Sequence, residues 1–177
     1  QDLDRILATM DQPSIDGLNT FYVSQLTRAS GTIVALSGLG ADELFGGYSS
    51  FWLSPRLLRM RRLLAALPGG LGAAKLVLAR RGRDARSQKV LSFLQGSGSA
   101  AAAYLTVKGQ FLGEGMRRLG DLQAGFDPVL HLERLGGEGD ALFNRISRYE
   151  LGAYLHDQLL RDADVMTDSR AFTALVR

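Results

Sequence analysis

The sequence predicts a chain that is mostly α-helical, with at most a few short strands. Apolar residues recur every three or four positions through most of the 177 residues, which is the spacing of one helix face. A single β-branched apolar run, at residues 32–36, interrupts this pattern. The length suits one domain with a real hydrophobic core and leaves little room for a second large domain.

The first 50 residues are expected to contain two helices and one strand. Helical spacing covers residues 2–10 and 14–30, with Pro13 between them and Gly31 where a helix usually stops. Residues 32–36 read Thr-Ile-Val-Ala-Leu. A short run of this kind, bounded by glycines, is typical of a strand buried on both faces of a parallel sheet.

The remainder is expected to be helical. Further helices are predicted at residues 51–67, 72–81, 88–94, 99–110 and 142–165. Between the last two, residues 112–140 are rich in glycine and charge, so we expect an irregular connection with short helical turns there.

Composition limits the classes of function. The chain has no cysteine and two histidines, which excludes disulfides and thiolate chemistry and makes a histidine-rich metal site improbable. No apolar run approaches the roughly 20 residues that cross a bilayer, and no secretory signal is visible after Gln1. We therefore expect a cytoplasmic protein without a membrane partner, whose start looks cut rather than natural.

Charge is unevenly distributed. The net charge is +3, but residues 51–90 carry ten basic side chains against one acid, Asp84. A solvated basic helix face is the favoured interpretation. A surface for an acidic partner domain, or for nucleic acid, is the alternative, and nucleic acid is disfavoured because aromatic residues do not alternate with the basic ones.

The segment that follows the expected strand has the composition of a phosphate-binding turn. Ser37, Gly38, Leu39 and Gly40 lead into a helix expected to begin near residue 41. Glycines permit positive φ and close backbone approach, and amides at a helix start attract anions. The carboxylates that follow at residues 42 and 43 either cap the helix or bind a Mg²⁺ that accompanies phosphates.

The full string at residues 36–48, Leu-Ser-Gly-Leu-Gly-Ala-Asp-Glu-Leu-Phe-Gly-Gly-Tyr, resembles the second signature of the asparagine synthetase synthase domain, whose family includes β-lactam synthetases. Two other stretches are similar to that family in content and order. Residues 11–16, Asp-Gln-Pro-Ser-Ile-Asp, look like its Asp-Glu-Pro-x-x-Asp stretch, and residues 154–166 look like its later helix.

This resemblance implies an α/β fold, the N-type ATP pyrophosphatase or adenine nucleotide alpha hydrolase-like fold, of which residues 1–177 would be a single partial synthase domain. Residues 1–50 would be the nucleotide-site segment and residues 51–177 the helical remainder. ATP would activate a substrate carboxylate as an acyl-adenylate, and an amine would then displace AMP.

The resemblance also implies site residues. The residues that would line the nucleotide are Ser37, Gly38, Leu39, Gly40, Asp42 and Glu43. Asp42 would also hold Mg²⁺, and Glu43 would tolerate substitution better than Asp42. Asp157 would face the substrate. The substrate would be an acidic amino acid or a related acid, and the amide nitrogen would come from glutamine through a glutaminase domain of the parent chain. A homodimer is a further implied possibility.

Several features depart from the family pattern. The Ser-Gly-Gly-x-Asp-Ser loop is missing from these residues, and no catalytic residue can be assigned. Leu39 stands where asparagine-forming members often carry an acid, and an apolar side chain cannot steer an ammonium group. We therefore expect an internal piece of an amidotransferase that is inactive alone. The competing hypothesis is a non-enzymatic binding domain derived from that family.

Overall fold

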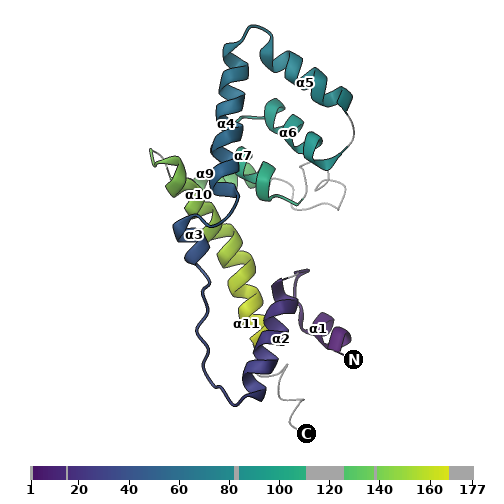
Figure 1. The fold of residues 1–177 in the computed structure, drawn as a ribbon, viewed down its shortest axis with the longest axis vertical. Coiled ribbons are helices and arrows are strands. Elements are labelled where there is room, and N and C mark those ends of the chain that lie inside the picture. Colours follow the sequence, from purple (N-terminus) through teal and green to yellow (C-terminus); the bar gives the residue numbers. More distant parts are fainter. Residues whose placement is uncertain (1, 15, 82–83, 111–125, 138, 168–177) are drawn as a thin grey trace. The chain divides into compact units, whose positions relative to one another are not determined.

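A computed structural model of the chain describes residues 2–14, 16–81, 84–110, 126–137 and 139–167 (Figure 1). These residues are helical or irregular, and none of them forms a strand. The chain folds as two compact units. Unit 1 combines Gln1–Leu44 with Glu150–Arg177, and unit 2 comprises Phe45–Tyr149.

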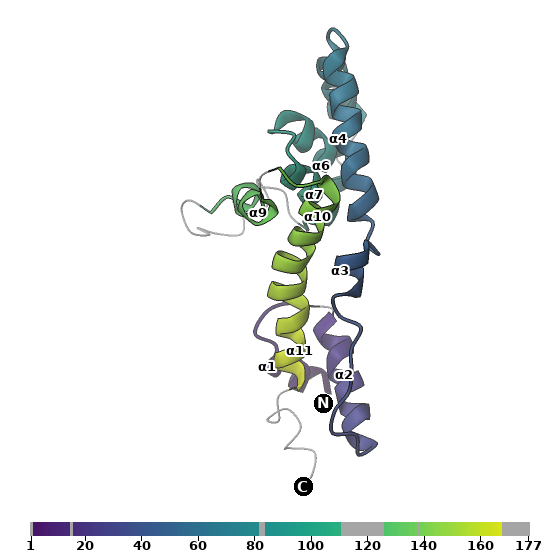
Figure 2. The same cartoon turned by 90° about the vertical axis from the view of Figure 1, so that its left-hand side faces the viewer.

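Unit 1 is built from helices at both ends of the chain. They are α1 (Asp2–Thr9), α2 (Asp16–Ala29), α3 (Ala41–Phe45), whose last residue belongs to unit 2, η1 (Glu150–Leu160) and α11 (Arg161–Thr167). Both views place α2 and α11 side by side (Figures 1 and 2). Together with α1 they bury a small apolar core formed by Ile6 of α1, Phe21 of α2 and Met166 of α11. The predicted helices at 2–10 and 14–30 are thereby confirmed.

The predicted strand at residues 32–36 is wrong for this structure. The segment is irregular, and Ile33 and Leu36 are 97% and 100% exposed. A strand forms only when its backbone amides and carbonyls pair with a neighbouring chain. No described residue forms a strand, so the β-branched run has nothing to pair with and its side chains remain in solvent.

Helix η1 is a π-helix of 11 residues. The periodicity at residues 142–165 predicted one helix, whereas the chain forms three successive helical elements there, α10 (Leu142–Tyr149), η1 and α11. π-helical geometry is rare, usually lasts a single turn and is frequent at functional sites. It therefore draws attention to the side chains that η1 carries.

Unit 2 contains the remaining helices. They are α4 (Ser50–Ala66), α5 (Gly70–Arg81), α6 (Ala85–Gln95), α7 (Ala100–Lys108), α9 (Pro128–Gly136) and α10. Helix α4 packs on α7, α5 packs on α6, and α9 packs on α10. The predicted helices of this region are confirmed, with boundaries shifted by a few residues. Within the region expected to be irregular, α9 is a regular helix capped by Asp127, and residues 111–125 lie outside the described part.

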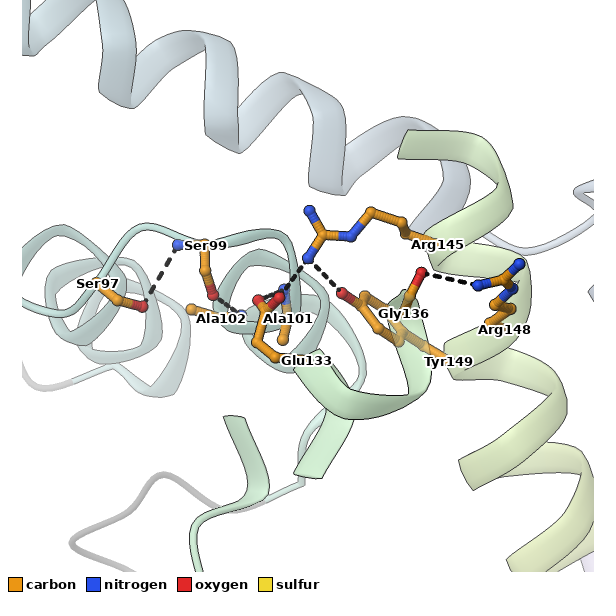
Figure 3. Close-up of polar contacts among 9 residues, drawn as sticks. All are labelled: Ser97, Ser99, Ala101, Ala102, Glu133, Gly136, Arg145, Arg148 and Tyr149. Carbon is orange, nitrogen blue, oxygen red and sulfur yellow. Dashed lines mark hydrogen bonds and ion pairs between the residues drawn. The ribbon is translucent and has the colours of Figure 1, made fainter. Parts of the chain in front are cut away.

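A polar network joins three helices of unit 2 (Figure 3). Arg145 pairs with Glu133 and also donates to the Tyr149 hydroxyl at 3.2 Å. The other Glu133 oxygen accepts from the Ala101 amide at the start of α7, 3.1 Å away. Burial raises the pKa of Tyr149, although the nearby Arg145 guanidinium opposes the shift. The network gives the Glu133 carboxylate and the buried Tyr149 hydroxyl hydrogen-bond partners and links α7, α9 and α10.

A helix that crosses a bilayer needs about 20 predominantly apolar residues. In the described part of the chain, no single helix meets that requirement. The helical stretches Ala41–Ala66 and Gly70–Arg80 meet it only when taken together, and they are bent by 120° at their junction.

Candidate functional site

The glycine-rich segment forms a tight turn that leads into α3. The Ser37 hydroxyl accepts from the Leu39 amide at 3.2 Å, and the Gly38 carbonyl accepts from the Ala41 amide at 3.3 Å. Gly40 has a φ of +95°, a conformation that side-chain-bearing residues rarely adopt. The predicted turn into a helix is therefore present and Gly40 has the positive φ, but the predicted strand before it is absent and Gly38 does not have positive φ. Two backbone amides, those of Leu39 and Ala41, are already used inside the turn.

The two carboxylates of this segment lie in different environments. Asp42 is exposed in the first turn of α3, whereas Glu43 is 1% exposed. An exposed carboxylate beside a glycine-rich turn is compatible with Mg²⁺ binding, because Mg²⁺ that accompanies phosphates needs only one or two protein carboxylates. Glu43 cannot serve in this way without being uncovered. The prediction that Glu43 is the more tolerant of the two concerns activity and stays a prediction. The structure adds that Glu43 is buried, and a buried carboxylate is costly to disturb.

The stretch at residues 11–16 lies against the later helices. The Gln12 side-chain amide donates to the Asp157 carbonyl at 3.1 Å, and Asp11 pairs with Arg161 at 2.8 Å. Ser14 donates to the largely buried carboxylate of Asp162.

The last acid of the stretch makes two further contacts. Asp16 accepts from the Tyr154 hydroxyl at 3.2 Å and from Gln158 at 3.3 Å. Two motifs that lie more than 130 residues apart in the sequence therefore form one polar interface in unit 1.

Tyr154 connects this interface to the glycine-rich segment. Its pKa is raised to about 12, first by burial and then by the negative charges of Asp16, Glu150 and Glu43. The phenol therefore remains a protonated hydrogen-bond donor at neutral pH. A side chain added at Gly40 would lie 3.8 Å from Leu155, the next residue along η1. All three motifs of the sequence thus meet around the first half of η1.

Sequence reasoning did not single out Tyr154. It is the first residue of the matching stretch at residues 154–166, and it lies four positions before Gln158, which is the spacing of helical neighbours. That spacing is the feature of the sequence from which a shared role of Tyr154 and Gln158 could have been predicted. Asp157, which was predicted to face the substrate, is exposed and lies 2.7 Å from His156. The structure thus places Asp157 on the same helix as Tyr154 but gives it a different side-chain partner.

A hollow of about 950 Å³ lies beside the turn in unit 1. The side of α2 from Asn19 to Arg28 forms one wall and residues 31–37 with Leu39 form another, while Ala163 and Thr167 of α11 also line it. The hollow therefore includes Ser37 and Leu39 of the predicted nucleotide segment. Among the described residues, no group of three or more acidic, histidine or cysteine side chains is arranged to hold a metal ion. A metal ion bound by Asp42 would therefore need its other oxygen ligands from a bound molecule or from water.

Comparison with known proteins identifies the family. The family model for asparagine synthase matches residues 1–174, which is almost the whole chain. No curated protein and no solved structure matches it. The chain therefore belongs to the asparagine synthase family. This assignment does not favour a non-enzymatic binding domain.

Proposed function

We propose that this chain is part of an ATP-dependent amide-forming enzyme, and that unit 1 carries one side of its nucleotide site. ATP would react with a substrate carboxylate to give an acyl-adenylate and pyrophosphate, and an amine would then displace AMP to form the amide. The family match over residues 1–174 carries this proposal. The meeting of the three motifs around Tyr154 supports it.

The turn and η1 are compatible with the following individual roles. The backbone of residues 37–40 would lie beside the phosphates, and the exposed Asp42 carboxylate would hold Mg²⁺. Asp157, exposed on η1, would face the substrate. The buried Glu43 would support the turn rather than touch the ligand.

The proposed substrate is an acidic amino acid or a related acid, with glutamine as nitrogen donor through a glutaminase domain of a longer cytoplasmic parent chain, which could be a homodimer. That parent would supply the pyrophosphate-gripping loop. Because fixed electrostatic contacts to the phosphates lower the barrier, the 177-residue chain alone is expected to release no pyrophosphate. Leu39 is partly exposed and apolar, so the acceptor acid is to be found by screening acids rather than assumed to be aspartate.

The test is ATP–pyrophosphate exchange by the parent enzyme and its Asp42→Asn variant. Asparagine keeps the size and capping ability of aspartate but lowers its charge, so exchange should fall by about tenfold or more while the melting temperature stays unchanged. Asp4→Asn, in α1, is the matched control. Exchange retained at the parent level would remove Asp42 from the site, and a large fall in melting temperature would make it a structural residue.

A further inference from the structure

Helix η1 has a backbone geometry that requires support from outside the helix. π-helices mostly last a single turn, whereas η1 runs for 11 residues. After Leu160 the chain changes to the α-helical geometry of α11. A carbonyl oxygen bonds to the fifth following amide in a π-helix and to the fourth in an α-helix. At such a change, one carbonyl in the preceding turn is left without an amide of the helix.

The stretch at residues 11–16 supplies contacts to this part of the chain. They involve Tyr154, Asp157, Gln158, Arg161 and Asp162. Four of these five contacts go to side chains, whereas the Gln12 side-chain amide donates to the main-chain carbonyl of Asp157 at 3.1 Å. Asp157 lies in the last turn of η1 before the junction with α11. Gln12 therefore places a donor at the change from π to α geometry.

Residue 12 departs from the family pattern. The similar stretch reads Asp-Glu-Pro-x-x-Asp, so that glutamine stands here in place of glutamate. An ionised carboxylate only accepts hydrogen bonds, and it could not donate to the carbonyl of Asp157. The contact therefore depends on the amide that this chain has, and membership of the family does not imply it.

The contact holds the main chain of the residue that is proposed to face the substrate. The Asp157 carboxylate lies 2.7 Å from His156, and 59% of the Asp157 side chain is exposed. That carboxylate is open to a ligand while its backbone is fixed by Gln12. A π-helix has more residues per turn than an α-helix. A change of η1 to α geometry would therefore turn Asp157 about the helix axis and away from its present direction.

We propose that Gln12 is a positioning residue for substrate binding. Its amide stabilises the π geometry of η1 and so sets the direction of the Asp157 carboxylate. The inference rests on the proposed function, because it takes Asp157 as the residue that faces the substrate. It adds a role for a side chain that lies outside the glycine-rich turn and acts through the backbone of a helix.

The first test is steady-state ATP–pyrophosphate exchange by the parent enzyme, with aspartate, glutamate, malate and glutarate as probe acids. Gln12→Met keeps the length of the side chain but removes the donor, and Gln12→Glu introduces the residue of the family pattern. Both should raise KM for the active acid by about two- to tenfold, the effect of one neutral hydrogen bond. The kcat should stay within about twofold of the parent value, because binding of the ground state and of the transition state weakens equally.

Two further variants separate the donor from the packing of the side chain. Gln12→Lys keeps a donor on a chain of similar reach and should have a KM close to that of the parent enzyme. Gln25→Met removes another half-buried glutamine of unit 1, in α2, and is the matched control. It should leave both KM and kcat unchanged.

A second readout needs no substrate. Hydrogen exchange of the 177-residue chain, followed by mass spectrometry, reports how readily the backbone hydrogen bonds of η1 open. Gln12→Met should speed the exchange of amides in residues 150–160 by about two- to tenfold and leave those of α4 at the parent rate. Circular dichroism of each variant verifies that it is folded.

Three results would overturn the inference and leave the proposed function standing, provided that Asp42→Asn has lost exchange. They are an unchanged KM in both Gln12→Met and Gln12→Glu, a raised KM that Gln12→Lys does not restore, and unchanged hydrogen exchange in η1. The second of these would make Gln12 a packing residue only. A parent enzyme that exchanges with none of the four acids would overturn the proposed substrate class, and this inference with it.

Discussion

The hydrogen bond between Tyr154 and Asp16 tests the convergence of the motifs most directly. It joins residues 138 positions apart, at a donor–acceptor distance of 3.2 Å. Hydrogen bonds to a charged acceptor contribute about 1.5–3 kcal/mol when well formed. Because this distance is longer than the roughly 2.5–3.0 Å usual for an O–H···O bond, we expect Tyr154→Phe to lower the free energy of unfolding by only about 1 kcal/mol.

A double-mutant cycle isolates this bond from other effects. Asp16→Ala alone also removes the contact with Gln158, 3.3 Å away, and an acidic residue from the first turn of α2. Combining it with Tyr154→Phe cancels those terms and leaves the coupling between the two side chains. Urea unfolding of the four proteins should give a coupling of about 1 kcal/mol.

The control uses a tyrosine on the same helix as the acid. Tyr22, in α2, is 40% exposed, and Tyr22→Phe should be additive with Asp16→Ala within about 0.3–0.5 kcal/mol. A coupling for Tyr154 that is no larger than this control value would refute the interface between residues 11–16 and η1.

Two further predictions concern pH and backbone conformation. Because the pKa of Tyr154 is raised from 10.0 to about 12, its stabilising effect should be complete below pH 10 and should be lost as the pH rises toward 12. Ultraviolet titration should show one fewer late-ionising tyrosine in Tyr154→Phe, and an unchanged high-pH profile would contradict the assignment. Gly46 has a φ of +80°, and a Cβ there would lie 2.9 Å from Phe143. Gly46→Ala should therefore destabilise the chain by about 1–2 kcal/mol, whereas Gly72→Ala, in open space on α5, should stabilise it by about 0.5–1 kcal/mol. Thermal unfolding measures both, and equal effects would show that the conformation of Gly46 is unimportant.

The sequence predicted the helices well because their periodicity is local. Residues 51–67 are the clearest example, since the observed helix α4 runs from Ser50 to Ala66. Residues 32–36 were mispredicted for the opposite reason. A β-branched run favours a strand only where another strand completes its hydrogen bonds, and the described residues contain none.

The site was only partly predictable. The turn at residues 37–40 could be anticipated from its glycines, and Gly40 does adopt positive φ. The different burial of Asp42 and Glu43 could not, because neighbouring acids in a helix look alike until its packing is known. The contacts of Asp16 with η1 could not be predicted either, because the periodicity of apolar residues carries no information about residues so far apart in the sequence.

The same long separation makes it costly to form unit 1 from both ends of the chain. Closing a flexible loop of about 140 residues costs about 4 kcal/mol by the (3/2)RT ln n relation, more than one hydrogen bond such as that of Tyr154 returns. The cost falls if residues 45–149 fold first and hold their own ends together. Phe51 and Phe143, near those ends, have ring centres 4.9 Å apart, and Gly46 packs on the same Phe143 ring. Packing within unit 2 thus shortens the effective loop, and the three motifs can meet because the intervening helices form a unit of their own.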